Sequence, residues 1–334
     1  MGGEGKVGGG TPGLCGTSSR ARHVLQWVPW NERRWIGDLL EEAGRMRSGR
    51  SRLALVLGGG GSKGAMQAGL YRALCQLGIR PDLIVGASVG ALNGAAIAAG
   101  VGPKTLAHGW ESLSRRDLLR FNRRILWRLG AVRSIFSSNR FYRFLEGRLP
   151  VRTFSELKIP LMVITTRLAT GEARVWERGD LPKAVQASCS IPGILPPVKD
   201  HEGIWHVDGA LADNLPVETA RERGATHIIA MNCRTCARCA PEPDSLSDVI
   251  GLAFGIAIDC KLRAMEQRYR DDPTVLLLQP DIGERIYALD FSHGRRLVEA
   301  GYEYSLPRIR AWWERTFPAG SLLPRGSTVE VSSR

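Results

Sequence analysis

Six short apolar runs recur along the chain, and each has the length of a buried β-strand. They span residues 53–57, 83–86, 161–167, 204–207, 227–231 and 275–279. Segments with helical periodicity separate them, and strands that alternate with helices are typical of a parallel sheet. The pattern therefore predicts an α/β fold, a three-layer α/β/α arrangement with a mostly parallel central sheet.

Two longer apolar stretches, 91–101 and 249–258, fall short of the roughly 18 apolar residues that a membrane-spanning helix requires. We expect both to be helices of the core. The chain has 334 residues, of which 43% are hydrophobic, so it is long enough to bury one sizeable core.

Composition divides the chain into a central domain and flanking regions. These are a glycine-rich disordered tail (1–22), an amphipathic helical region (23–50), a globular domain (51–316) with a basic insert (112–146), and a C-terminal tail (317–334).

Ser88 stands between Gly86 and Gly90, after a predicted strand and before a predicted helix at 91–98. A G-x-S-x-G sequence in a strand–turn–helix is the pattern of a nucleophile elbow, which presents a serine hydroxyl at the end of a strand. A glycine-rich turn that only packs the helix onto the sheet is the alternative interpretation.

A second glycine cluster follows the first predicted strand and ends in Lys63-Gly64. A phosphate-binding Walker loop would need Ser or Thr after the lysine, so that interpretation fails. The glycines also fit the G-x-G-x-x-G pattern of dinucleotide-binding folds, but the next strand ends at Ser88 instead of the acidic residue that such folds use. An oxyanion hole made by the backbone N–H groups of Gly59, Gly60 and Gly61 uses both glycine motifs in one site.

A serine nucleophile needs a base, and none of the six histidines lies in a convincing loop motif. Asp208 is a different candidate, because it ends the predicted strand 204–207 and is followed by Gly209 and Ala210. A simple Asp-Gly turn is the alternative.

Four motifs in this order together resemble the patatin-like phospholipases. They are the glycine loop 59–64, the elbow 86–90, a Pro-containing segment 187–198, and an aspartate block that runs from Asp208 through Asn214 to Pro216. The resemblance covers about residues 53–232 and extends more weakly to about 315. Lys63 stands where the family often has Arg, and Ala210 stands where it often has a second glycine.

The resemblance implies a serine–aspartate dyad that needs no cofactor. Ser88 would attack an ester carbonyl, Asp208 would accept the serine proton, and the glycine loop would stabilise the oxyanion. The supporting motif positions are Lys63, Gly64, Gly86, Gly90, Gly209 and Ala210. The implied activity is hydrolysis of an acyl ester of a phospholipid or lysophospholipid by the domain at 51–316.

Two other classes of function stay open. One is an NAD(P)-dependent oxidoreductase that uses the same glycine loop, and the other is a catalytically silent, membrane-binding regulatory module.

The formal net charge of +13 is concentrated in one segment, because residues 115–143 hold nine arginines and one acid. Leucines and aromatic residues at roughly helical spacing interleave with them, a pattern typical of helices that lie on anionic membranes. The candidate docking residues are Arg120, Arg123, Arg124 and Arg128. A solvated cap helix is the alternative, and no nucleic-acid-binding motif accompanies the basic face.

Seven cysteines and no apolar leader at the N-terminus predict a cytoplasmic protein with reduced thiols, able to bind a membrane peripherally. Cys233, Cys236 and Cys239 form a C-x-x-C-x-x-C cluster without an obvious fourth ligand. A redox-sensitive loop is the preferred interpretation, and a metal site is the weaker one.

Overall fold

A computed structural model of the chain describes residues 51–122, 134–233, 246–283 and 286–318. The chain divides into a unit Met1–Arg50 and a unit Ser51–Arg334. The regions predicted at 1–22 and 23–50 lie outside the described residues, as does most of the tail predicted at 317–334.

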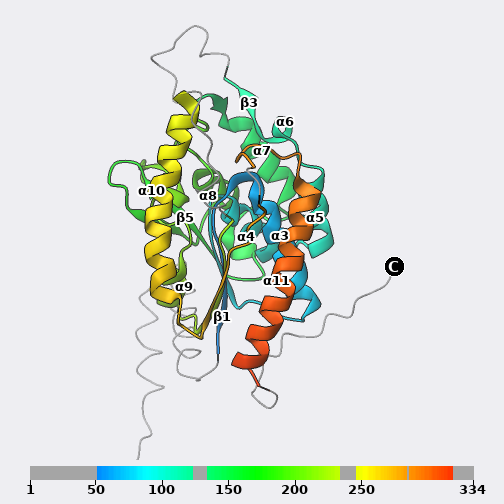
Figure 1. Cartoon of the computed structure of the whole chain (residues 1–334). Helices are drawn as coiled ribbons and strands as arrows, with labels where there is room; N and C mark the ends of the chain where they lie inside the picture. Colours follow the sequence, from blue (N-terminus) through cyan, green and yellow to red (C-terminus); the bar gives the residue numbers. More distant parts are fainter. Residues whose placement is uncertain (1–50, 123–133, 234–245, 284–285, 319–334) are drawn as a thin grey trace, which may run out of the picture. The chain divides into compact units, whose positions relative to one another are not determined.

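An eight-stranded sheet forms the centre of the domain (Figure 1). Its path is β10 (Val275–Leu278), β9 (His227–Met231), β1 (Leu53–Leu57), β2 (Leu83–Ala87), β5 (Leu161–Arg167), β8 (Trp205–Asp208) and β7 (Val198–Lys199), with β6 (Ala173–Trp176) paired to β5 off this path. The pairs from β10 to β5 are parallel, and β6, β7 and β8 are antiparallel. The predicted fold class and all six predicted strands are confirmed, whereas the short strands β6 and β7 were not predicted.

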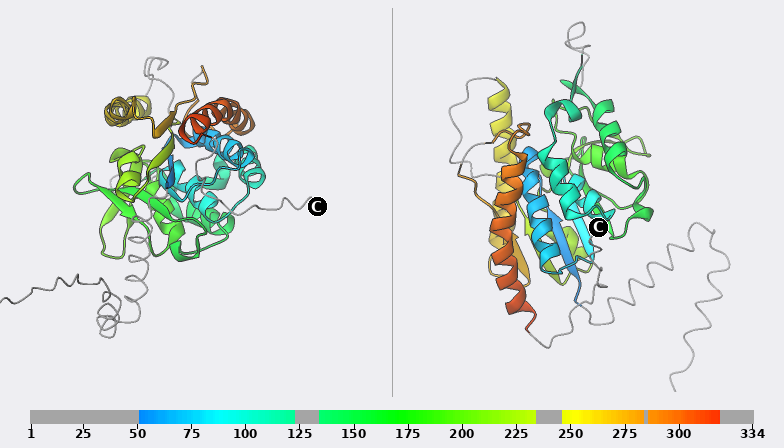
Figure 2. Two further views of the ribbon diagram at one scale, coloured as in Figure 1. Left: turned by 90° about the horizontal axis from the view of Figure 1, so that it is seen from below. Right: turned by 90° about the vertical axis from the view of Figure 1, so that its right-hand side faces the viewer.

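Alternation along the strands creates two cores, one on each face of the sheet. Leu55 and Leu57 of β1 point into one core, and Ala54 and Val56 point into the other. The first face is covered by α3 (Ala65–Gln76), α4 (Val89–Ala98), α5 (Pro103–Glu111), α8 (Leu181–Ser188) and α11 (Gly294–Thr316). The second is covered by α9 (Val217–Glu222) and α10 (Leu246–Tyr269), which completes the three layers (Figure 2).

The helices α3 and α11 approach each other at two glycines. A Cβ at Gly69 would lie 2.1 Å from the carbonyl oxygen of Val298, and a Cβ at Gly301 would lie 2.2 Å from that of Met66. Because no side chain fits at either position, the two backbones pack directly against each other. This contact ties α11 to the helix that follows the glycine loop.

In its described parts, the basic insert is not the one continuous helix that its leucine spacing indicated. It contains α6 (Arg115–Leu118), a hairpin of β3 (Arg120–Phe121) and β4 (Phe136–Ser137), and α7 (Ser138–Arg148). The Ile135 N–H donates to the carbonyl of Gly193, and this tertiary contact favours the hairpin over a continued helix. Arg120 is exposed on β3, and Arg123, Arg124 and Arg128 lie outside the described residues.

The two long apolar stretches have different outcomes. α4 is buried along most of its length, as predicted for 91–101. The expectation that 249–258 is buried is wrong, because Val249 and Ile256 of α10 are 48% and 61% exposed. No helix among the described residues combines the length and hydropathy needed to cross a membrane.

Candidate active site

Ser88 occupies a sharp turn between β2 and α4. Its φ of 54° makes it the only non-glycine residue with a positive φ among those the structure describes. A Cβ at Gly86 would lie 2.5 Å from the carbonyl oxygen of Gly90, and a Cβ at Gly90 would lie 2.0 Å from that of Leu57. The turn therefore requires both glycines, and it places the serine side chain at the carboxyl edge of the sheet.

Strand register brings Asp208 to the same place. Ala87 pairs with Ile164 of β5, and Thr165, the next residue of β5, pairs with Asp208. Gly209 is required beside it, because a Cβ there would lie 2.1 Å from the Ile164 carbonyl oxygen. The serine and the aspartate, far apart in sequence, therefore meet across the end of β5.

The Ser88 hydroxyl donates a hydrogen bond to Asp208 Oδ2 over 2.7 Å. The other carboxyl oxygen, Oδ1, accepts the backbone N–H of Ala210 at 2.9 Å. Burial raises the pKa of Asp208 to about 7, although both hydrogen bonds act to lower it. Ala210 has no positive φ, so the alanine at this motif position fits the turn.

Two side chains fix the loops on either side of this pair. Ser188 Oγ accepts the backbone N–H of Ser88 at 2.8 Å and donates to the Ile164 carbonyl at 2.6 Å. Asn214 Oδ1 accepts the N–H of Gly59 at 3.0 Å. Both residues lie within motifs that the sequence singled out, but no sequence pattern indicated these contacts.

The glycine loop enters a 3-10 turn, Gly61–Gly64, before α3. The expectation that three consecutive amides face the site needs correction, because the Gly59 N–H is used by Asn214. No hydrogen bond among the described residues uses the N–H of Gly60 or Gly61. These two amides are the donors that the loop can offer to a bound anion.

The segment that follows β10 in the sequence covers the start of α3. The Ser62 N–H donates to the Ala288 carbonyl at 2.7 Å, and the Ser62 hydroxyl donates to the Tyr287 carbonyl at 2.9 Å. Dinucleotide-binding folds place a pyrophosphate at this helix terminus. The covered terminus disfavours the oxidoreductase alternative. Gly64, the last glycine of the motif, faces Val89, whose Cγ2 would lie 2.4 Å from a Cβ there.

An apolar pocket opens at Ser88. The side chains that line it are almost all hydrophobic and come from α4, α5, α6, α7 and the segments after α8 and β10. They include Leu92, Trp110, Leu118, Leu119, Phe141, Ile191, Ile194, Leu289 and Phe291. The lining suits a hydrocarbon chain better than a charged ligand.

Two nearby groups are excluded as nucleophile or base. Cys189 lines the same pocket, but burial, and to a smaller extent the nearby Asp208, raises the pKa of its thiol, which keeps it protonated. The fully buried His206 bonds Asp200 through Nε2 and Thr165 through Nδ1, both at 3.0 Å. None of the histidines in the described ranges makes a hydrogen bond with the side chain of Ser88 or Asp208.

The cysteine cluster is only partly visible. Cys233 is buried beneath Gly60, whose Cβ would lie 2.8 Å from that of Cys233, and burial raises the pKa of its thiol to about 12. Cys236 and Cys239 lie outside the described residues. Within the ranges that the structure covers, no three His, Cys, Asp or Glu side chains gather as metal ligands would.

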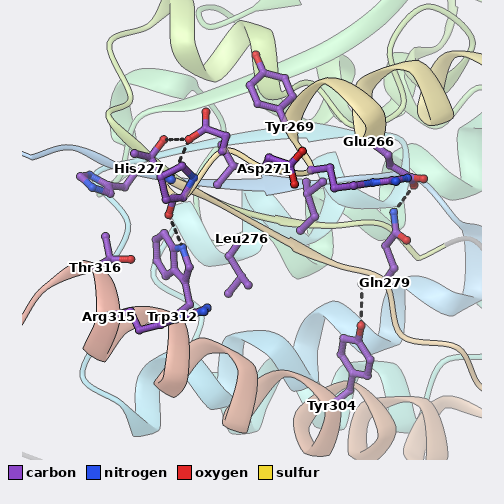
Figure 3. A pocket seen from close by; sticks show the side chains of 16 residues that line it. His227, Glu266, Tyr269, Asp271, Leu276, Gln279, Tyr304, Trp312, Arg315 and Thr316 are labelled. Carbon is purple, nitrogen blue, oxygen red and sulfur yellow. Dashed lines mark hydrogen bonds between the residues drawn. The ribbon is translucent and has the colours of Figure 1, made fainter.

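A larger groove of about 870 Å³ lies along the edge strand β10, between α10 and α11 (Figure 3). Tyr269, Tyr304 and Trp312 line it, and the Trp312 N–H donates to the carbonyl of Pro273. The Ser88–Asp208 pair does not contribute to its lining. The groove is therefore separate from the candidate active site.

Comparison with known proteins gives relatives of one kind. "Patatin-like phospholipase domain-containing protein 7" of Mus musculus is 34% identical to this chain over 297 residues, which cover 80% of this chain and 21% of that protein. "Patatin-like phospholipase domain-containing protein 6" of Homo sapiens is 32% identical over 184 residues, covering 54% of this chain and 13% of that protein. The chain thus spans about a fifth or less of the length of these relatives.

Among solved structures, the crystal structure of VipD from Legionella pneumophila has a similar fold. The TM-score is 0.50 at 15% sequence identity, over 78% of this chain and 67% of that one.

A family model described as patatin-like phospholipase matches residues 55–221, half of the chain, and includes both Ser88 and Asp208. The chain therefore belongs to the patatin-like phospholipase family.

Proposed function

We propose that the protein hydrolyses a carboxylic ester of a phospholipid or lysophospholipid, with Ser88 as nucleophile and Asp208 as base. The observation that carries the proposal is the 2.7 Å hydrogen bond between the two side chains, buried at the mouth of an apolar pocket. Membership of the patatin-like phospholipase family supports the substrate class.

In the proposed reaction, Ser88 Oγ attacks the ester carbonyl and its proton passes to the Asp208 carboxylate. The carbonyl oxygen becomes an oxyanion, which the N–H groups of Gly60 and Gly61 stabilise. The intermediate collapses to an acyl-serine while the proton moves from Asp208 to the departing alcohol. A water molecule then hydrolyses the acyl-serine with Asp208 again acting as base.

The environment of Asp208 supports this role. A carboxylate with an ordinary pKa near 4 is a weak base for an alcohol at neutral pH. Because burial raises the pKa of Asp208 to about 7, the group is a stronger base that is still substantially ionised at neutral pH.

The test is labelling of the full chain with a fluorophosphonate probe, followed by peptide mapping and assay on a soluble ester. Wild type should be labelled at Ser88, and Ser88→Ala should lose both labelling and turnover while its unfolding transition is retained. Labelling at Ser190, whose hydroxyl donates to the Gln186 carbonyl, would refute the assignment.

The oxyanion donors are better tested through Asn214 than through the glycines. A Cβ at Gly60 would displace the buried Cys233, so Gly60→Ala would combine a structural defect with a catalytic one. Asn214→Ala removes the acceptor that holds Gly59, and we expect it to lower kcat by about tenfold or more with KM little changed. A rise in KM alone would make the loop a binding element.

We also propose that the basic insert docks the enzyme on anionic lipid. Its described arginines Arg115, Arg116, Arg120, Arg140 and Arg143 are all exposed. A variant with Arg120, Arg123, Arg124 and Arg128 changed to Gln should lose salt-sensitive binding to anionic vesicles in co-sedimentation. Equal binding of wild type and variant would reduce the insert to a solvated cap.

A further inference from the structure

The helix α10 is longer than the strands that it covers. It has 24 residues, about 36 Å at the helical rise, whereas β9 has 5 residues and spans about 17 Å. Among the α10 side chains that the structure describes, the buried ones, Ile258, Leu262 and Tyr269, belong to its second half. Since α10 follows β9, its first half begins at the carboxyl edge of the sheet and projects past that edge (Figure 1).

The two halves of α10 differ sharply in polarity. Residues 246–258 include a single charged residue, Asp248, whereas Asp259, Lys261, Arg263, Glu266 and Arg268 follow within the next ten positions. Charged side chains thus occupy the half that packs on the sheet, while the projecting half is apolar. This is the reverse of what solvation in water alone would favour.

Exposed apolar residues of the projecting half form one stripe. Val249, Ala253 and Ile256 are all exposed, and their spacing of four and three residues places them on one face of the helix. We call these three residues the α10 stripe. None of the hydrophobic clusters in the described part of the chain includes them.

Other exposed apolar side chains belong to segments at the same end of the domain. Phe121 and Ile135 of the β3–β4 hairpin are 49% and 45% exposed, and Tyr287 is 57% exposed. The hairpin lies at the same end of the domain as the start of α10 in Figures 1 and 2. Tyr287 directly precedes Ala288, which lines the Ser88 pocket. Apolar side chains from three separate segments are therefore exposed at the end of the domain at which Ser88 lies (Figure 1).

We propose that the α10 stripe inserts into the hydrocarbon surface of a lipid bilayer and holds the Ser88 pocket against it. The proposal rests on the proposed lipid ester hydrolysis. A protein partner that covered this edge would also cover the pocket, whereas a bilayer covers the edge and supplies the substrate. Arg120, the neighbour of Phe121 on β3, is also exposed, and exposed arginines close to apolar residues are typical of surfaces that bind lipid headgroups. Insertion through the stripe does not depend on anionic lipid, which separates it from docking by the basic insert.

A matched pair of substitutions tests this assignment. Ala253 and Ala264 are both exposed and stand eleven residues apart, so they occupy the same face of α10, one in each half. The full-length variants Ala253→Asp and Ala264→Asp are compared in co-sedimentation with phosphatidylcholine vesicles at high salt, which screens the arginines. Ala253→Asp should weaken vesicle binding by about tenfold or more, because it carries a carboxylate into hydrocarbon. Ala264→Asp should bind within about twofold of wild type.

The controls separate the stripe from the catalytic proposal. Both variants should keep wild-type turnover of a short soluble ester. If wild type showed no ester turnover but its vesicle binding were still weakened by Ala253→Asp, the proposed hydrolase activity would be refuted and the proposed role of the α10 stripe would be supported. Equal binding of the two variants, or no binding of wild type to these vesicles, would overturn the stripe. A wild-type dimer in size-exclusion chromatography that Ala253→Asp dissociates would also overturn it, by showing an interface between copies.

Discussion

Replacing Asp208 with asparagine should stabilise the folded protein at alkaline pH, although it removes the proposed base. Because burial raises the pKa of Asp208 from 3.8 to about 7, the folded protein binds this proton more tightly than the unfolded chain does. The stability that the proton provides is complete below about pH 4 and is lost as the pH rises through about 7. The asparagine side chain does not titrate, so the variant should keep the folding stability that the wild type loses as the pH rises.

The expected size follows from the pKa. A rise from 3.8 to about 7 corresponds to about 4 kcal/mol in total. Roughly a third of this is already lost near pH 5, so about 3 kcal/mol should disappear between about pH 5 and about pH 9. The free energy of unfolding of Asp208→Asn, relative to wild type, should therefore grow by that amount over this range and level off above about pH 8.

Urea unfolding at a series of pH values measures this difference, and Asp200→Asn is the matched control. Asp200 is also buried, and burial acts to raise its pKa, but hydrogen bonds from His206 and from the backbone of Ile204 and Glu202 hold its pKa below the usual value. Its carboxylate stays ionised throughout, so the control should lose stability by an amount that is constant above about pH 5. A stability difference between Asp208→Asn and wild type that is also constant with pH would refute the reasoning.

Three further outcomes are expected. In wild type, kcat/KM for a soluble ester should rise about tenfold per pH unit below about pH 7 and then level off, because only ionised Asp208 accepts a proton; a flat profile would contradict this. Ser188→Ala should cost about 1–3 kcal/mol in urea unfolding and lower kcat, because it leaves the buried Ser88 N–H without an acceptor; unchanged stability and kcat would show that the elbow holds itself. Gly90→Ala should prevent folding, because its Cβ would lie 2.0 Å from the Leu57 carbonyl oxygen. Gly109→Ala should instead raise the melting temperature, because the position is helical and a Cβ there has open space around it; equal melting behaviour of the two variants would argue against the crowding of the elbow.

The sheet could be predicted from the sequence because its central strands are apolar on both faces. All five residues of β1 are buried, and a continuous apolar run bounded by glycine shows this directly. The same signal was ambiguous for α10. An apolar helical stretch looks alike whether it is surrounded by protein or projects from it, and only the lengths of α10 and β9 separate the two cases.

Local sequence also identified Ser88 and Asp208 as candidates, since each follows a strand and is flanked by glycine. It did not reveal what holds them. Ser188 and Asn214 act through hydrogen bonds with distant backbone groups, and Ala288 accepts the Ser62 N–H with its backbone carbonyl. Every residue type carries a backbone carbonyl, so no sequence pattern could have predicted that contact. The hairpin of the basic insert was missed for a similar reason, because it depends on the carbonyl of Gly193.

The close contact of α3 with α11 has a consequence for the order in which the domain is completed during synthesis. Ser88 and Asp208 emerge from the ribosome well before α11. The α3 helix, however, packs through Gly69 directly against the backbone of α11. A nascent chain that ends after Asp208 also lacks Tyr287 and Ala288, whose carbonyls accept the hydrogen bonds of Ser62. Domains generally fold as units. The glycine loop should therefore reach its final geometry only when α11 has emerged, so that activity begins after translation of α11.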